Sequence, residues 1–167
     1  MSKREKGFSL IELLIVVAII LIIAAIAIPN LLRARIAANE ASAVGSVRTI
    51  VTSEVTYSST WGTGFAVALT NLGGAAVPCV ASANSACLVD PVLANKGAKS
   101  GYNFVATGGP AVNNVVTTFA VSAVPQTVGT TGQRSFCSDE SGVVRFDPTG
   151  VAAPATDVNC QALTALQ

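Results

Sequence analysis

The hydrophobic residues of this chain form one long run near the N-terminus and shorter patterns after it. From Leu13 to Ile28 all sixteen residues are apolar, and the span from Phe8 to Ile28, with Glu12 included, contains twenty-one residues. At about 1.5 Å per residue, a helix of that length crosses a hydrocarbon layer of about 30 Å. The pattern therefore predicts a membrane-spanning helix over residues 8–28.

After Pro29 the hydrophobic pattern becomes one-sided. Polar side chains recur at spacings of three and four and form one stripe, while small and branched apolar residues form a second stripe that Arg48 interrupts. This is the pattern of an amphipathic helix, which we expect to end near residues 58–60. Pro29 lacks a backbone donor and clashes with the carbonyl one turn earlier, so a kink is expected there. Residues 8–60 are thus predicted to form one long helix.

The remainder of the chain, residues 61–167, has the pattern of a small globular head. Turn-forming residues dominate residues 61–99, with signals such as Asp90-Pro91, so only short helices or strands are expected there. Beyond Gly101 the pattern is that of β-strands, and four are expected: 102–106, 115–124, 133–138 and 143–147. Short links imply an antiparallel sheet, which must bury one face against the one-sided half of the helix. The predicted fold class is α+β.

The charges around the apolar run predict its orientation. Three basic residues precede it and two follow it: Lys3, Arg4, Lys6, Arg33 and Arg35. The denser cluster predicts a cytoplasmic N-terminus, with the rest of the chain translocated outward. Ala25 and Ala27 imitate the cleavage site of a secretory signal peptide. The carboxylate of Glu12 and the helical pattern beyond Pro29 argue instead for a permanent anchor.

Glu12 is the one carboxylate in the apolar run. An acidic group at the centre of a membrane costs roughly 2.5–3.5 kcal/mol on insertion scales, and less near an end. One interpretation is that Glu12 reaches the lipid headgroups from the first turn of the helix. The other is that it pairs with a cation inside an assembled object. A cut after Gly7 would supply that cation, because Phe8 would then carry a new α-amino group four residues from Glu12.

Two stretches of the sequence closely resemble the N-terminus of type IV prepilins and related pseudopilins. They are Lys6-Gly7-Phe8-Ser9-Leu10-Ile11-Glu12-Leu13-Leu14 and Ala24-Ala25-Ile26-Ala27-Ile28-Pro29-Asn30. The resemblance implies that residues 1–7 are a leader, that prepilin peptidase cuts between Gly7 and Phe8, and that Phe8 is then N-methylated. Glu12 matches the assembly glutamate of the family, and Pro29 matches its helix-disrupting proline.

One residue departs from the family pattern. Many members have a glycine where this chain has Leu21, and leucine favours a helix over glycine by about 0.8 kcal/mol. Local melting of the helix before Pro29 in a filament is therefore less favoured here.

The resemblance also implies an architecture and a function. The order of a long helix and an antiparallel sheet matches the pilin fold, with an αβ-loop in the head. The expected product is a structural subunit that forms a homo-oligomeric helical filament, with residues 8–28 in its core. Its partners would be prepilin peptidase and the pilus assembly machinery, and it would pass from the inner membrane to the cell surface. A minor pilin, a type II secretion pseudopilin and a membrane-anchored binding module stay open, as do adhesion, twitching motility and DNA uptake.

Four cysteines lie in the head, which indicates disulfides in an oxidising compartment. They permit three pairings, of which Cys79–Cys87 with Cys137–Cys160 closes local loops and is the one we expect. Zinc binding would compete for the same thiols, but neither pair has the spacing of a CxxC site and the chain has no histidine.

Composition argues against an enzyme, a metal site or a cofactor. The absence of histidine excludes Ser-His nucleophilic triads, and no phosphate-binding or nucleophile-elbow motif occurs. The acidic residues of the C-terminal part fit no EF-hand spacing: Asp139, Glu140, Asp147 and Asp157. A formal net charge of +1 gives no electrostatic basis for binding nucleic acid.

Overall fold

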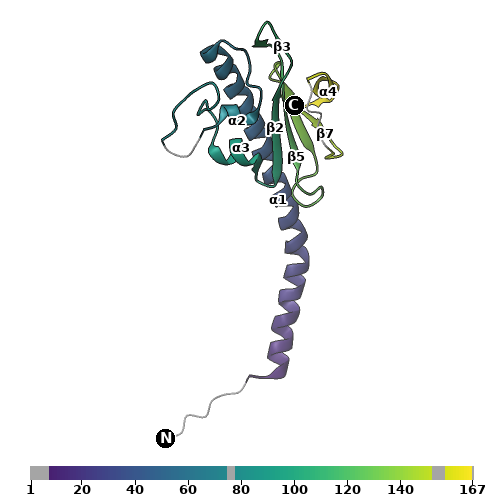
Figure 1. Cartoon of the computed structure of the whole chain (residues 1–167). Helices are drawn as coiled ribbons and strands as arrows, with labels where there is room; N and C mark the ends of the chain where they lie inside the picture. Colours follow the sequence, from purple (N-terminus) through teal and green to yellow (C-terminus); the bar gives the residue numbers. More distant parts are fainter. Residues whose placement is uncertain (1–7, 75–77, 152–156, 167) are drawn as a thin grey trace. The chain divides into compact units, whose positions relative to one another are not determined.

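The structure is a computed structural model that describes residues 8–74, 78–151 and 157–166 (Figure 1). The chain divides into two structural units, residues 1–35 and residues 36–167. Its first element, helix α1, spans Leu10–Trp61 and contains 52 residues, with Pro29 inside it. The predicted long helix is confirmed, and it runs through Pro29 as one helix.

The first unit consists of the apolar half of α1. From Leu10 to Leu32 its large side chains are exposed, and the helix offers no polar face to water. Within the described residues, α1 is the one helix whose length and composition suit a membrane crossing. This agrees with the apolar run in the sequence.

The second unit contains a six-stranded antiparallel sheet with the order β1-β2-β5-β6-β7-β8. Its strands are β1 (Ala98–Lys99), β2 (Tyr102–Gly108), β5 (Phe119–Pro125), β6 (Ser135–Asp139), β7 (Arg145–Asp147) and β8 (Thr164–Ala165). A separate hairpin pairs β3 (Ala111–Val112) with β4 (Val115–Val116). Three short helices complete the unit: α2 (Leu69–Leu72), α3 (Pro91–Lys96) and α4 (Asp157–Gln161).

The core of this unit lies between the second half of α1 and one face of the sheet (Figure 1). Val47 and Ile50 of α1 are fully buried in the same cluster as Phe119 and Phe136 of the central strands. Alternate residues of β2 are buried and exposed, as expected for a strand with one covered face. The predicted packing of an amphipathic helix on an antiparallel sheet is confirmed.

The predicted number and bounds of the strands are partly wrong. The expected strand 115–124 is two strands, because Val116 bonds with the chain just after α1 rather than with the main sheet: its N–H donates to Thr63 O (3.0 Å) and its carbonyl accepts from Phe65 N (2.9 Å). Gly64 lies between those two residues, at φ 81°, and a side chain there would collide with the Val116 carbonyl. The two-residue strands β1 and β8 are too short to leave an alternating pattern.

The signal Asp90-Pro91 marks the start of a helix rather than a turn. Asp90 is the N-cap of α3, since its Oδ1 accepts from Leu93 N (2.9 Å) and Pro91 occupies the first turn. Gly97 ends the helix at φ 58°. Short helices in this part of the chain were expected, and the two caps of α3 explain where that helix begins and ends.

Candidate assembly site

The first turn of α1 is organised by Glu12. Its Oε2 accepts a hydrogen bond from the backbone N–H of Ser9 (2.9 Å), and Leu13 N donates to Ser9 O (3.3 Å). Because Ser9 immediately precedes the helix, this contact is half of a capping box, in which the third helical residue reaches back to the N-cap. Glu12 therefore satisfies a backbone donor that the helix itself leaves unbonded.

The sequence contains a local signal for the capping role of Glu12, in addition to its position in an apolar run. Ser9-x-x-Glu12 has the spacing of a capping box, directly before an apolar run. The spacing of Glu12 from Ser9 predicts the hydrogen bond between the Ser9 N–H and the Glu12 carboxylate that the structure contains.

The remaining residues expected at this site lie as follows. Phe8 directly precedes the capped turn and is 80% exposed, and the Glu12 carboxylate folds back toward the same end of the helix. Gly7 and the rest of the leader, residues 1–7, fall outside the described residues. Pro29 lies seventeen residues beyond Glu12, about 25 Å along the helix, so it belongs to a different part of α1.

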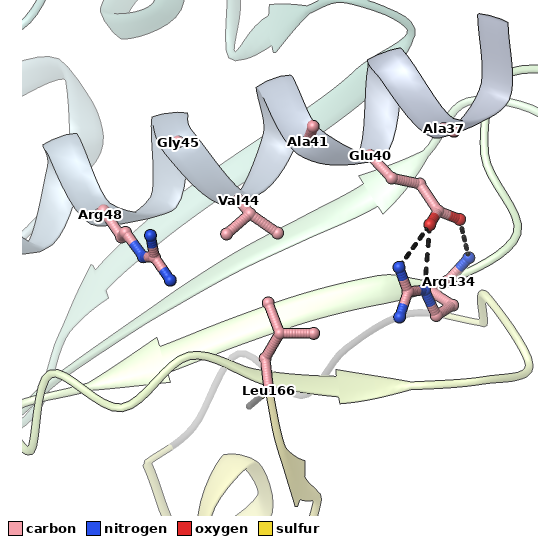
Figure 2. Close-up of a pocket in the computed structure, with 8 residues that line it drawn as sticks. All are labelled: Ala37, Glu40, Ala41, Val44, Gly45, Arg48, Arg134 and Leu166. Atoms are coloured by element: carbon pink, nitrogen blue, oxygen red, sulfur yellow. Dashed lines mark hydrogen bonds and ion pairs between the residues drawn. The ribbon is translucent and has the colours of Figure 1, made fainter. Parts of the chain in front are cut away.

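A second carboxylate of α1, Glu40, bonds to the start of β6. Its Oε1 accepts from the backbone N–H of Gln133 (2.9 Å). Figure 2 shows its contacts with Arg134: Oε1 accepts from the backbone N–H (3.1 Å), and Oε2 accepts from the guanidinium at Nε (2.9 Å) and Nη2 (2.7 Å). Burial disfavours its ionisation, yet these hydrogen bonds and the charge of Arg134 hold the pKa of Glu40 below its usual value. The expected strand 133–138 begins later, at Ser135, because Gln133 and Arg134 donate to Glu40 instead.

A shallow groove of about 390 Å³ runs beside α1 next to this ion pair (Figure 2). Small residues of the helix line it at a spacing of four: Ala37, Ala41 and Gly45. Val44 and Leu166 form its apolar floor, and a side chain built on Gly45 would meet no atom within 4 Å. The lining of the groove contains no arrangement of groups suited to catalysis.

Glu54 is a third carboxylate of α1 and is fully buried. Its Oε2 accepts from Ala66 N (2.7 Å), while its Oε1 has no hydrogen-bond partner among the described residues. Burial raises the pKa of Glu54 to about 7, against the effect of the Ala66 hydrogen bond, which lowers it. The amphipathic pattern gave no sign of this residue, because a single acidic position in a helix is usually solvated.

Two disulfides join Cys79 to Cys87 and Cys137 to Cys160, the pairs expected from the spacing. Cys137 and Cys160 are fully buried and pack with Val124 and Leu163, so this bridge fixes the C-terminal region to the face of the sheet that α1 does not cover. In the described part of the chain no three Cys, Asp or Glu residues lie close enough together to hold a metal ion.

The geometry defines a class of protein: an exposed apolar helix capped at its start by one carboxylate, continuous with a helix packed on an antiparallel sheet. A family model described as the prokaryotic N-terminal methylation motif matches residues 2–28. The chain is 41% identical over 96 residues to the type IV wide pilus major component PilA4 of Thermus thermophilus, which covers 52% of this chain and 73% of that protein. This chain belongs to the type IV pilin family.

A second relative is the type IV major pilin protein PilA of Myxococcus xanthus. It is 41% identical over 58 residues, which is 35% of this chain and 26% of that protein. No solved structure matches the chain.

Proposed function

We propose that this chain is the structural subunit of a type IV pilus filament. The observation that carries the proposal is the first half of α1, whose large apolar side chains are all exposed and whose one carboxylate caps its start. Such a surface requires cover from a membrane or from other copies of the chain. The two relatives from Thermus thermophilus and Myxococcus xanthus are named as major pilus components, which favours the shaft of the filament over a minor pilin or a pseudopilin.

Processing of the precursor would create the assembly site. Prepilin peptidase would remove residues 1–7 by cutting between Gly7 and Phe8, and the methylation motif supports N-methylation of Phe8. The new amine would be a cation at the capped end of α1, beside the carboxylate of Glu12. An ionised carboxylate offers about four acceptor positions, and the Ser9 N–H uses one of them. Glu12 can therefore cap its own helix and also accept the Phe8 amine of a neighbouring subunit.

This pairing would fix the axial register of the filament. An apolar helix can slide along another with little change in packing energy, whereas a buried ion pair is satisfied in one register only. Residues 8–28 would form the core of the filament, and residues 61–167 would form its outer surface. Pro29 would affect how the helices pack at the outer end of the core. The precursor would await assembly in the inner membrane, with the assembly machinery as its partner.

The proposed role is structural rather than enzymatic. The chain has no histidine. Of the three carboxylates of α1, Glu12 caps the helix, Glu40 pairs with Arg134, and Glu54 is buried and accepts from Ala66 N–H. None of them has the nucleophile and orienting group that covalent or acid–base catalysis requires. No cofactor or nucleic acid is part of the proposal.

Mass spectrometry of the main protein in filaments sheared from cells tests this proposal. The expected species starts at Phe8, carries one additional methyl group on its α-amine and contains both disulfides. It should also dominate the preparation, as a shaft subunit must. A mature chain that starts at Met1, or at Ala27 or later, would contradict the processing step, and a chain present in trace amounts would contradict the role as the major subunit.

A further inference from the structure

Three neighbouring side chains of α1 bond to one segment of the head. The loop segment, residues 62–74 and 78–97, connects α1 to the sheet and contains α2 and α3. Tyr57 donates to Ala83 O (2.7 Å), Ser53 donates to Leu88 O (3.4 Å), and Glu54 accepts from Ala66 N (2.7 Å). These contacts hold the loop segment at three separate points along its backbone.

Glu54 differs from the other two because its side chain is a carboxyl group. The hydroxyls of Ser53 and Tyr57 donate to backbone carbonyls, whereas the carboxyl of Glu54 can bring a charge into a fully buried position. One of its oxygens has no partner among the residues that the structure describes. An ionised carboxylate that is buried and incompletely bonded is costly, so the charged form favours any opening that lets water reach it.

Among the described residues, no charged side chain forms an ion pair or a hydrogen bond with Glu54. Its pKa shift has burial as the main cause and includes no contribution from the charge of another residue. Titratable groups of α1, the loop segment and the sheet are engaged elsewhere or face solvent: Tyr57 bonds to Ala83 O, Tyr102 bonds to Arg134 O, Asp90 pairs with Lys99 (3.2 Å), and Arg48 and Lys96 are exposed. The four cysteines are in disulfides.

We propose that Glu54 is a proton-controlled latch, which holds the loop segment against α1 when it is protonated and releases it when it is ionised. The protonated side chain keeps its bond to Ala66 N–H without a buried charge. Loss of the proton places a charge between α1 and the loop segment, and opening then lets that charge hydrate. The opening equilibrium of the loop segment would therefore depend on pH while the sheet stays folded. The latch concerns the head alone and does not depend on the filament role.

The size of the effect follows from proton linkage. The carboxyl titrates near 7 in the closed form and near its ordinary value of 4.5 in the open form, so opening is favoured as the pH rises between those values. Between about pH 5.5 and about pH 8.5 the opening equilibrium should increase about thirtyfold.

Amide hydrogen–deuterium exchange of the full chain in detergent, corrected for the intrinsic effect of pH, tests the latch. Peptides of the loop segment should lose about thirtyfold in protection between these two pH values, while peptides of β5 and β6 keep theirs. Glu54→Gln stays neutral and can still accept from Ala66 N–H, so its loop segment should stay protected at both pH values. Glu40→Gln, a matched change on the same helix, should retain the wild-type pH response.

Two results would overturn the latch: protection of the wild-type loop segment that changes less than twofold over this range, or a thirtyfold change that persists in Glu54→Gln. A ¹³C carboxyl titration of Glu54 in the wild-type chain provides a test that needs no variant. A midpoint near 7 supports the latch, and a midpoint near the ordinary value of 4.5 contradicts it.

Discussion

The two halves of α1 belong to one helix, but their apolar side chains lie in opposite environments. In the second half, residues such as Val47 and Ile50 are fully buried against the head, and the polar Ser46 and Ser53 are buried with them. In the first half, from Leu10 to Leu32, every large apolar side chain is exposed. The second half is therefore stabilised by its own chain, and the first half requires cover from outside it. A single helix can be part of a folded core and also provide an assembly surface.

The carboxylates on α1 reflect the same contrast. Glu40 and Glu54 bond to the head, at Arg134 and Ala66, and so contribute to folding within the chain. Among the residues that the structure describes, Glu12 bonds to the first turn of its own helix, and its carboxylate retains acceptor positions for another molecule. Changes in the second half should thus alter the stability of the head, whereas changes in the first half should alter assembly.

Truncation of a central core residue should have the largest effect on stability. Phe136 is fully buried beneath α1, so Phe136→Ala should lower the free energy of unfolding of the head by about 4 kcal/mol. Denaturant unfolding in detergent, followed by tryptophan fluorescence from Trp61, measures the change. The control Ile15→Ala in the exposed half should leave the transition within about 0.5 kcal/mol. An equal loss in both variants would mean that the two halves do not differ as described.

Removal of the disulfides should have the next largest effect. Replacing Cys137 and Cys160 by serine opens a loop with a sequence separation of 23 and should cost about 3 kcal/mol. Replacing Cys79 and Cys87 opens a separation of 8 and should cost somewhat less, about 2.5 kcal/mol by the same loop-closure estimate. The same unfolding measurement ranks the two double variants. The reverse order would show that loop closure does not control their contributions.

Loss of the Glu40 contact should destabilise the head by about 2 kcal/mol, since Glu40→Ala leaves donors of Gln133 and Arg134 without an acceptor. Because the pKa of Glu40 is lowered in the folded state, its contribution is complete above its ordinary value of 4.5 and is lost as the pH falls through the folded-state value. Unfolding curves at acidic and neutral pH should therefore converge for wild type and Glu40→Ala as the pH falls. A difference that grows in acid would contradict this assignment.

The smallest effect is expected at Ser9. The contact with Glu12 uses the backbone N–H of Ser9 and not its hydroxyl, so Ser9→Ala retains it. Filament yield should stay near the wild-type value, and helix content measured by circular dichroism in detergent should change little. A large loss of filaments in Ser9→Ala would point to a function of the hydroxyl that this geometry does not include.

Sequence patterns predicted the elements that depend on periodicity. The 52 residues of α1 follow from the apolar run and the one-sided stripe after Pro29, and β2 follows from its alternation. Local spacing was also sufficient for the pairs Cys79–Cys87 and Cys137–Cys160. These features depend on interactions between residues that are close in the sequence.

The features that sequence patterns missed depend on distant residues. Glu40 and Arg134 are 94 positions apart, and no local pattern relates them. Val116 leaves the main sheet because the chain after α1 bonds to it, which alternation within residues 115–124 cannot reveal. The burial of Glu54 depends on the path of the loop segment. Of the missed contacts, the one between Ser9 and Glu12 had a local signal, the spacing of a capping box.

The measurement that tests the central claim most directly is the filament yield of Glu12→Gln compared with wild type. The glutamine oxygen can still accept from Ser9 N–H, so the start of α1 stays capped, but the side chain has no charge to pair with a neighbour's Phe8 amine. We expect normal cleavage and normal amounts of protein in the membrane, with few or no filaments in the sheared fraction. Filaments at the wild-type yield would contradict the claim that the charge of Glu12 directs assembly.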